Sequence, residues 1–184
     1  MNEDNQRVRI TKRMIKDSFL RLLYQESIHK LSVKQICEEA EINRTTFYRY
    51  YGSQYDLFEE MERDLIAQIN DYLATTDVAG DNEQLFTKTI SLVNDNIDLC
   101  KLLVNNHIDP EFPEKLLLSL RVTQSKVYQQ ILNKYSKDDI EYIFHFLVGG
   151  GFSLIRAWIN KESREPPEKI AALLTSSLER LLRE

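Results

Sequence analysis

The chain has 184 residues and a formal net charge of −5, and its 42% hydrophobic and 29% charged residues are typical of a soluble globular protein. The charge is uneven: residues 1–50 hold ten Lys and Arg against seven Asp and Glu, a net charge of +3, and residues 51–184 hold fourteen against twenty-two, a net charge of −8. A basic N-terminal part on an acidic remainder favours a polyanionic partner at one end only, although a chance fluctuation gives the same small excess.

Several classes of protein are excluded by what the sequence lacks. The first residues, MNEDNQRVRI, contain no apolar signal core, and no run of eighteen apolar residues follows, so we expect a cytoplasmic protein without a membrane span. Cys37 and Cys100 lie in apolar helical patterns and are predicted to be buried thiols rather than a disulfide. Gly-rich phosphate loops and the H-E-x-x-H and G-x-S-x-G motifs are absent, and the histidines have no partner at metal-ligand spacing. The sequence therefore predicts neither an enzyme nor a bound cofactor or metal.

Helical periodicity runs from the start of the chain. A first helix is predicted at about residues 8–26, because four apolar residues share one face: Ile15, Phe19, Leu22 and Leu23. Ser32 followed by Gln35 is a capping-box signature that predicts a short second helix. Asn43 is a suitable N-cap for a third helix over about residues 44–50, which Gly52 ends before Ser53 caps a fourth.

The remaining sequence is also helical, without a competing strand pattern or repeat. A long fourth helix is predicted at about 54–75. Later helices are predicted at about 83–104, 114–135, 137–161 and in the segment after SREPPEK. Pro110 and Pro113 prevent the helices at about 83–104 and 114–135 from forming one continuous helix. The prediction is an all-α fold of about nine helices.

The aromatic-rich stretch INRTTFYRYYGSQYDLF, residues 42–58, separates into faces once its first part is placed on a helix. Phe47 and Tyr51 are four residues apart, so they share a face and pack inward. The outward faces carry Arg44, Thr45, Tyr48 and Arg49. Two short helices joined by a tight turn are the helix-turn-helix plan, whose second helix enters the major groove. The alternative interpretation is that the aromatic residues only form a hydrophobic hinge.

The outward side chains have the chemistry that DNA recognition needs. An arginine can fork onto guanine, and a threonine can bind a base edge or contact a thymine methyl group. Threonine and tyrosine hydroxyls and helix N-termini hold phosphate oxygens.

The segment LSVKQICEEAEINRTTFYRYYGSQYDLF resembles the helix-turn-helix signature of the TetR-type transcriptional repressors, and the resemblance is specific over about residues 8–60. The segment FHFLVGGGFSLIRAWINKESREPPEKIAALL is similar to a C-terminal region of one branch of that family. The resemblance implies base contacts by Arg44, Thr45 and Tyr48. It also implies phosphate contacts by Ser32, Thr46, Tyr48, Tyr50 and Gln54. Arg49 is added to the predicted phosphate contacts because it faces outward. Near the N-terminus, basic residues either enter the minor groove or form a solvated end: Arg7, Arg9 and Lys12.

Three positions depart from the family pattern. Glu41 replaces the usual glycine of the inter-helix turn, and a non-glycine residue in a left-handed conformation costs about 1 kcal/mol, so we expect a slightly reshaped turn. Ser27 replaces the usual glycine after the first helix. Gln54 replaces the lysine that commonly meets a phosphate, which should lower the salt dependence by about one unit per half-site.

Apolar stripes on the last two predicted helices favour a homodimer built through a four-helix interface. The predicted interface residues are Leu147, Gly151, Leu154, Trp158, Leu174, Leu178 and Leu181. Gly149, Gly150 and Gly151 each weaken a helix by roughly 0.8–1 kcal/mol, so they indicate close backbone packing or, as the alternative, a kink beside a ligand cavity.

The resemblance also implies a regulatory small molecule bound among the middle helices. Candidate lining residues are Tyr72, His107, Tyr128, Tyr142 and His145, and the alternative for each is an ordinary core or surface polar group. These features predict an N-terminal helix-turn-helix DNA-binding unit at 1–53 and a larger helical regulatory and dimerisation domain at 54–184. The function expected from them is a dimeric repressor released from a palindromic operator by a ligand. The alternatives are an activator that recruits a partner protein through its C-terminal helices, and a helical interaction protein that binds no DNA.

Overall fold

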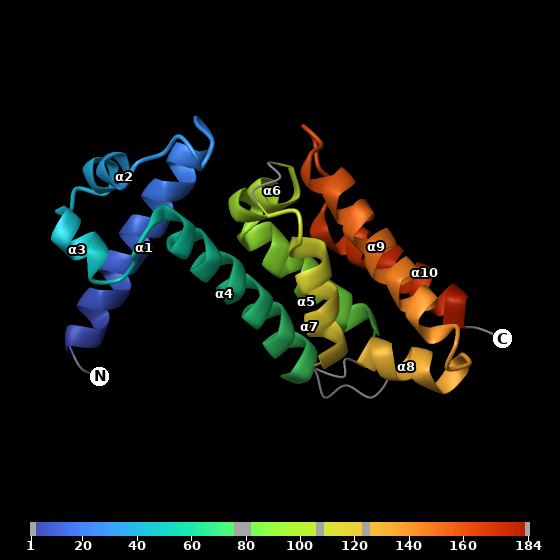
Figure 1. The fold of residues 1–184 in the computed structure, drawn as a ribbon. Helices are drawn as coiled ribbons and strands as arrows, with labels where there is room; N and C mark the ends of the chain where they lie inside the picture. Colours follow the sequence, from blue (N-terminus) through green and yellow to red (C-terminus); the bar gives the residue numbers. More distant parts are fainter. Residues whose placement is uncertain (1–2, 76–81, 106–108, 123–125, 183–184) are drawn as a thin grey trace. The chain divides into compact units, whose positions relative to one another are not determined.

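A computed structural model describes residues 3–75, 82–105, 109–122 and 126–182 of the chain. These residues form ten α-helices and no strand (Figure 1): α1 (Glu3–Leu23), α2 (Val33–Glu39), α3 (Arg44–Tyr48), α4 (Gln54–Thr75), α5 (Asn82–Asp95), α6 (Ile97–Asn105), α7 (Phe112–Val122), α8 (Lys126–Lys134), α9 (Ile140–Ile159) and α10 (Pro167–Leu182). The predicted all-α class is confirmed, with one helix more than expected.

The chain divides into two compact units, residues 1–65 and 66–184, and the division falls within α4. The first, called the N-terminal unit, contains α1, α2, α3 and the first part of α4. The second, called the C-terminal unit, contains the end of α4 and the six helices that follow.

The core of the N-terminal unit takes an apolar face from each of its helices. Ile15 and Phe19 of α1, Ile36 of α2, Phe47 of α3 and Leu57 of α4 are fully buried. Burying a side chain of this size stabilises a fold by roughly 1.5–3 kcal/mol. α3 has 5 residues, and an isolated helix shorter than about 12 residues is marginal in water. α3 is therefore helical because the core holds it.

Side-chain caps begin the helices where the sequence predicted them. The Ser32 hydroxyl accepts the Gln35 N–H at 3.3 Å while Gln35 Oε1 accepts the Ser32 N–H at 2.9 Å, a complete capping box for α2. The Asn43 side chain caps α3. The Ser53 hydroxyl accepts the N–H of Asp56 at 3.2 Å and begins α4. Each cap stabilises its helix by roughly 1 kcal/mol.

The turn between α2 and α3 is a Schellman motif with Glu41 at its left-handed position. The N–H of Ile42 donates to the carbonyl of Cys37 at 3.0 Å, and the N–H of Glu41 donates to that of Glu38 at 3.3 Å. Glu41 has a φ of 53° and is the only non-glycine residue with a positive φ in the described stretches. The reshaped turn that the sequence led us to expect is not seen: Glu41 keeps the left-handed conformation, and glutamate bears the steric cost that glycine avoids.

In the C-terminal unit α10 packs along α5, and α9 contacts α6, α7, α8 and α10. Ile131 of α8 and Phe144 of α9 form the buried centre of one apolar cluster. The sequence predicted one helix at 83–104, and this prediction is wrong because the chain turns at Asn96 and forms two helices, α5 and α6. The Asn96 side chain donates to the carbonyl of Leu92 at 2.9 Å, a local bond that competes with regular helix.

The helix predicted at 114–135 also differs from the structure. It corresponds to α7 and α8, with residues 123–125 between them outside the described stretches.

α9 exposes much of its apolar surface in the single chain. It has 20 residues, and an 18-residue window within it has a mean hydropathy of 1.3 with 17% of that window buried, so length and composition alone would let it cross a membrane. One such helix is weak evidence for a membrane span. The sequence predicted none because Glu141, His145 and Arg156 interrupt the apolar run.

Candidate nucleic-acid interface

The short helix α3 presents one face to the core and the other to solvent. Phe47 is fully buried, whereas Arg44 and Thr45 are exposed and Tyr48 is 55% exposed. Arg49, the C-cap residue, is exposed as well. The structure therefore brings the three predicted base-contacting side chains together on the free surface of one helix.

The aromatic residues of this segment are ordered around Phe47. The Tyr48 ring meets Phe47 edge-on with 5.7 Å between ring centroids, and the Tyr51 ring lies 5.6 Å from Phe47. Tyr51 is 3% exposed, as the predicted inward face requires. Tyr50 is half-buried beside Tyr51, with 6.4 Å between centroids. The stretch thus serves both as core and as surface, divided by helix face.

Two of the predicted phosphate donors already use their hydroxyl hydrogens within the chain. The Thr46 hydroxyl donates to Asn43 Oδ1 at 2.9 Å, and the Ser32 hydroxyl donates to Gln35 Oε1 at 2.6 Å. A hydroxyl has one hydrogen to donate. Either hydroxyl must give up this hydrogen bond before it can donate to a phosphate, so Thr46 and Ser32 are less available than Tyr48.

The loop after α3 is fitted closely to the start of α4. The N–H of Gly52 donates to Asp56 Oδ2 at 3.0 Å, and a Cβ on Gly52 would lie 2.7 Å from that same oxygen. A larger residue would therefore displace the Asp56 side chain. Gln54, the first residue of α4, is half-buried.

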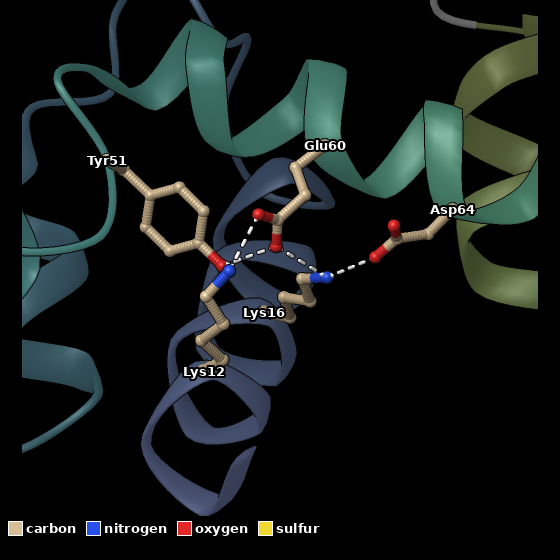
Figure 2. Close-up of polar contacts among 5 residues, drawn as sticks. All are labelled: Lys12, Lys16, Tyr51, Glu60 and Asp64. Atoms are coloured by element: carbon tan, nitrogen blue, oxygen red, sulfur yellow. Dashed lines mark hydrogen bonds and ion pairs between the residues drawn. The ribbon is translucent and has the colours of Figure 1, made fainter. Parts of the chain in front are cut away.

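A polar cluster that the sequence did not predict joins α1, α4 and the end of the α3 segment (Figure 2). We call it the Glu60 cluster, and its members are Lys12, Lys16, Tyr51, Glu60 and Asp64. Glu60 Oε2 accepts Lys12 at 2.8 Å, and Glu60 Oε1 accepts Lys16 at 2.9 Å and the Tyr51 hydroxyl at 2.8 Å. Lys16 also pairs with Asp64 at 2.6 Å.

The ionisation of the cluster follows from these contacts. Burial alone would raise the pKa of the Glu60 carboxyl, but the hydrogen bonds from its three donors outweigh burial and lower the pKa to about 2. Burial, and then the hydrogen bond to Glu60, raises the pKa of the Tyr51 hydroxyl well above its usual value. Burial opposes charge on Lys16, but its two carboxylate partners raise the pKa of its ammonium group. Glu60 is therefore ionised and Lys16 is charged at neutral pH.

Lys12 is the basic residue that sequence reasoning placed differently. It was expected either in the minor groove or in a solvated terminus, and the structure holds it on Glu60 with its Nζ 5.3 Å from the Tyr51 ring centroid. Lys12 and Lys16 are four residues apart, as are Glu60 and Asp64, so the spacing places each pair on one helix face, but it does not indicate that the two faces meet. Arg7 and Arg9 are exposed on α1.

The residues predicted for dimerisation lie partly inside the C-terminal unit. Trp158, Leu174 and Leu178 are 2%, 9% and 2% exposed in the single chain. A Cβ on Gly151 would lie 3.6 Å from Leu174 Cδ2, so these two residues face each other. The other predicted residues are half-buried: Leu147, Leu154 and Leu181. The apolar stripe that the sequence assigned to a partner is therefore partly buried by the chain's own packing.

The residues predicted to line a ligand site are placed only in part. Tyr142 is 77% exposed and His145 is exposed, both on the surface of α9. The side chains of Tyr72 and Tyr128, and His107 as a whole, lie outside what the structure describes.

Comparisons with known proteins agree with this geometry. Residues 17–61 match the family described as "Bacterial regulatory proteins, tetR family", and residues 80–180 match a TetR-type "Transcriptional regulator C-terminal region". The chain is 30% identical over 138 residues to the dhaKLM operon transcriptional activator DhaS of Lactococcus lactis, covering 73% of this chain and 71% of that protein.

Two further similarities span most of the chain. It is 22% identical over 169 residues to the uncharacterized HTH-type transcriptional regulator YxbF of Bacillus subtilis, covering 85% of this chain but 42% of that longer protein. A TetR transcriptional regulator from Streptococcus agalactiae shares the fold with a TM-score of 0.68 and 22% identity, over 95% of this chain and 97% of that one. The chain belongs to the TetR family, whose members are DNA-binding transcription regulators and not enzymes.

Proposed function

We propose that the protein works as a homodimer that reads a palindromic DNA site with α3 and represses transcription until a small molecule releases it. The observation that carries the proposal is the two-sided α3: Phe47 is buried, while Arg44, Thr45 and Tyr48 are free to meet base edges. A well-placed bidentate arginine discriminates its base by roughly 1–3 kcal/mol. Exposed side chains of these types on a helix that is anchored from behind support major-groove reading.

The DNA-reading claim is tested with single substitutions on the exposed face. The probe is the DNA beside the protein's own gene that the wild type protects from nuclease digestion. Arg44→Ala should weaken binding roughly tenfold and relax the preference at one position of each half-site. Tyr48→Ala should also weaken binding. Arg63→Ala, which removes an exposed arginine of α4 that pairs with Glu59, is the matched control and should leave both quantities unchanged. Full affinity and unaltered sequence preference in both α3 variants would refute the assignment.

The homodimer is supported by an uncovered apolar face on α9. Tyr142 and Phe146 are 77% and 68% exposed, and the exposed Gly149, Gly150 and Ser153 continue the same helical face. A Cβ on Gly149 or Gly150 would meet nothing within 4 Å in the single chain, which leaves room for another helix to approach closely. We place the partner copy on this face. A two-fold pair would present its reading helices about 34–36 Å apart, one turn of DNA.

The dimer claim has its own experiment. Phe146→Glu introduces a charge in the middle of the uncovered face and should give a monomer by light scattering, with weakened binding to a two-half-site duplex. Asn133→Glu, at an exposed position of α8, is the control and should remain dimeric. A Phe146→Glu protein that stays dimeric would move the interface elsewhere.

The direction of regulation has a second candidate. The L. lactis relative at 30% identity is named a transcriptional activator, which favours activation through a partner protein on the same scaffold. Deleting the gene separates the two: target transcripts rise if the protein is a repressor and fall if it is an activator. Either role acts on DNA, so we place the protein in the cytoplasm.

Control by a small molecule rests on the C-terminal unit. The match of residues 80–180 to the C-terminal region of TetR-type regulators supports it. The exposure of Tyr142 and His145 leaves Tyr72, His107 and Tyr128 as the candidates that the proposal retains. Thermal unfolding of the protein with metabolites of the neighbouring genes tests the claim, since a ligand that binds the folded state raises its stability. If no such compound shifts the transition or weakens DNA binding, release by a ligand is refuted.

A further inference from the structure

The Glu60 cluster lies where α1, α4 and the end of the reading segment meet (Figure 2). One carboxylate, 19% exposed, holds three donors: the ammonium groups of Lys12 and Lys16 and the hydroxyl of Tyr51. Two of these donors come from α1 and the third from the segment that follows α3, while Glu60 itself belongs to α4. Glu60 is therefore the shared acceptor of three separate parts of the N-terminal unit.

The hydroxyl of Tyr51 connects this acceptor to the reading helix. The Tyr51 ring packs on Phe47, the buried anchor of α3, at 5.6 Å between centroids, and the N–H of Tyr51 donates to the Phe47 carbonyl at 3.0 Å. Because the Glu60 carboxylate holds the hydroxyl of Tyr51, the Tyr51 ring is held in one orientation. The orientation of α3 is consequently tied to Glu60 through Tyr51.

The charge of the cluster has a separate consequence. Lys12 and Lys16 are balanced by Glu60 and Asp64, so the four charges sum to zero. The Lys12 ammonium lies 6.0 Å from the ring centroid of Tyr50, a residue predicted to hold a phosphate. A lysine beside a phosphate-binding position would ordinarily add to sequence-independent attraction for DNA. Here Glu60 neutralises it at 2.8 Å.

We propose that Glu60 is a specificity-determining positioning residue, which fixes the reading segment through Tyr51 and withholds the Lys12 charge from the DNA backbone. Both effects favour the specific site over other DNA. The first strengthens contacts that need an exact orientation of α3, and the second weakens the attraction that any duplex exerts. The inference rests on the proposed reading of DNA by α3.

The test compares two duplexes of equal length: the footprinted site beside the protein's own gene and a scrambled version of it. Glu60→Gln keeps the size of the side chain and removes its charge. We expect its affinity for the site to fall roughly tenfold, as for the loss of one charged hydrogen bond, and its affinity for the scrambled duplex to rise. The salt dependence of scrambled binding should become steeper by about one unit, because one more lysine meets a phosphate.

Three further variants separate this mechanism from its alternatives. Glu59→Gln makes the same charge change one residue earlier, on a side chain that is 69% exposed and 3.6 Å from Arg63, and should leave the ratio of the two affinities unchanged. Tyr51→Phe should lower affinity for the site without raising that for the scrambled duplex. The double variant Lys12→Gln with Glu60→Gln should lose the gain on the scrambled duplex while the loss on the site remains.

The inference is overturned if Glu60→Gln lowers both affinities in proportion, which is the result of simple destabilisation, or if Glu59→Gln changes the ratio equally. Circular dichroism at the assay temperature establishes the folded fraction of each variant. Arg44→Ala and Tyr48→Ala are measured in parallel. If both bind the site with normal affinity and sequence preference, the reading of DNA by α3 fails. If they do not and Glu60→Gln keeps the wild-type ratio, only the role of Glu60 fails.

Discussion

Replacing Glu41 with glycine should stabilise the protein, because this residue holds a conformation that favours glycine. Its φ is 53°, in the left-handed region, at the position of a Schellman turn where glycine is usual. For a residue with a Cβ that conformation costs about 1–2 kcal/mol. Glycine removes this cost but adds freedom to the unfolded chain, which offsets about 0.4–1 kcal/mol. The net gain in the free energy of unfolding should be roughly 0.5–1 kcal/mol.

Urea unfolding followed by circular dichroism measures the gain. The midpoint should rise with an unchanged slope, since a change of slope would indicate an altered denatured state. Glu41→Ala is the matched control: it removes the exposed carboxylate but keeps the Cβ, so it should give little of the gain. If alanine and glycine stabilise equally, the carboxylate and not the backbone is responsible, and the reasoning from φ is refuted.

Three other outcomes are expected. Phe47→Ala should destabilise the protein by about 3–5 kcal/mol, because it empties a buried aromatic site. Tyr48→Ala, at an exposed site, should change the stability by no more than about 0.5 kcal/mol. Equal losses in urea midpoint would contradict the division of α3 into a buried and an exposed face. The pKa of Glu60 is lowered to about 2, so the stability from its ionised form is present at neutral pH and declines as pH falls from about 4.5 toward 2. The difference in urea midpoint between wild type and Glu60→Gln should therefore shrink in that pH window. A constant difference would refute the stabilising role of the ionised carboxylate. Burial raises the pKa of the Cys100 thiol to about 12, so at pH 8 a thiol reagent should modify Cys100 and the buried Cys37 only after unfolding, and rapid modification of the native protein would contradict their burial.

Features set by neighbouring residues could be predicted from the sequence. The capping box at Ser32 and the cap at Asn43 depend on contacts within a few positions, and both were found where the pattern indicated. The division of α3 into an inner Phe47 and an outer Tyr48 follows from helical geometry once the helix is placed. These local rules were sufficient to define the candidate DNA-reading surface.

Features set by distant partners could not be predicted. Periodicity identified the apolar residues of α9 and α10, but it does not say whether a stripe meets the same chain or another one. Leu174 and Leu178 are buried within the chain, whereas Phe146 and Gly150 are exposed. Lys12 illustrates the same limit, because its partner Glu60 is 48 residues away.

α3 is helical only while the core of the N-terminal unit supports it, since 5 residues do not make a stable helix alone. Recognition of DNA and folding of this unit are therefore lost together on heating. A substitution at Phe19 or Ile36, remote from any base, would yield a temperature-sensitive regulator: normal control in the cold, and constitutively altered transcription a few degrees higher. Genetic screens for conditional regulators should thus recover core positions of α1 and α2 as readily as positions on the reading face.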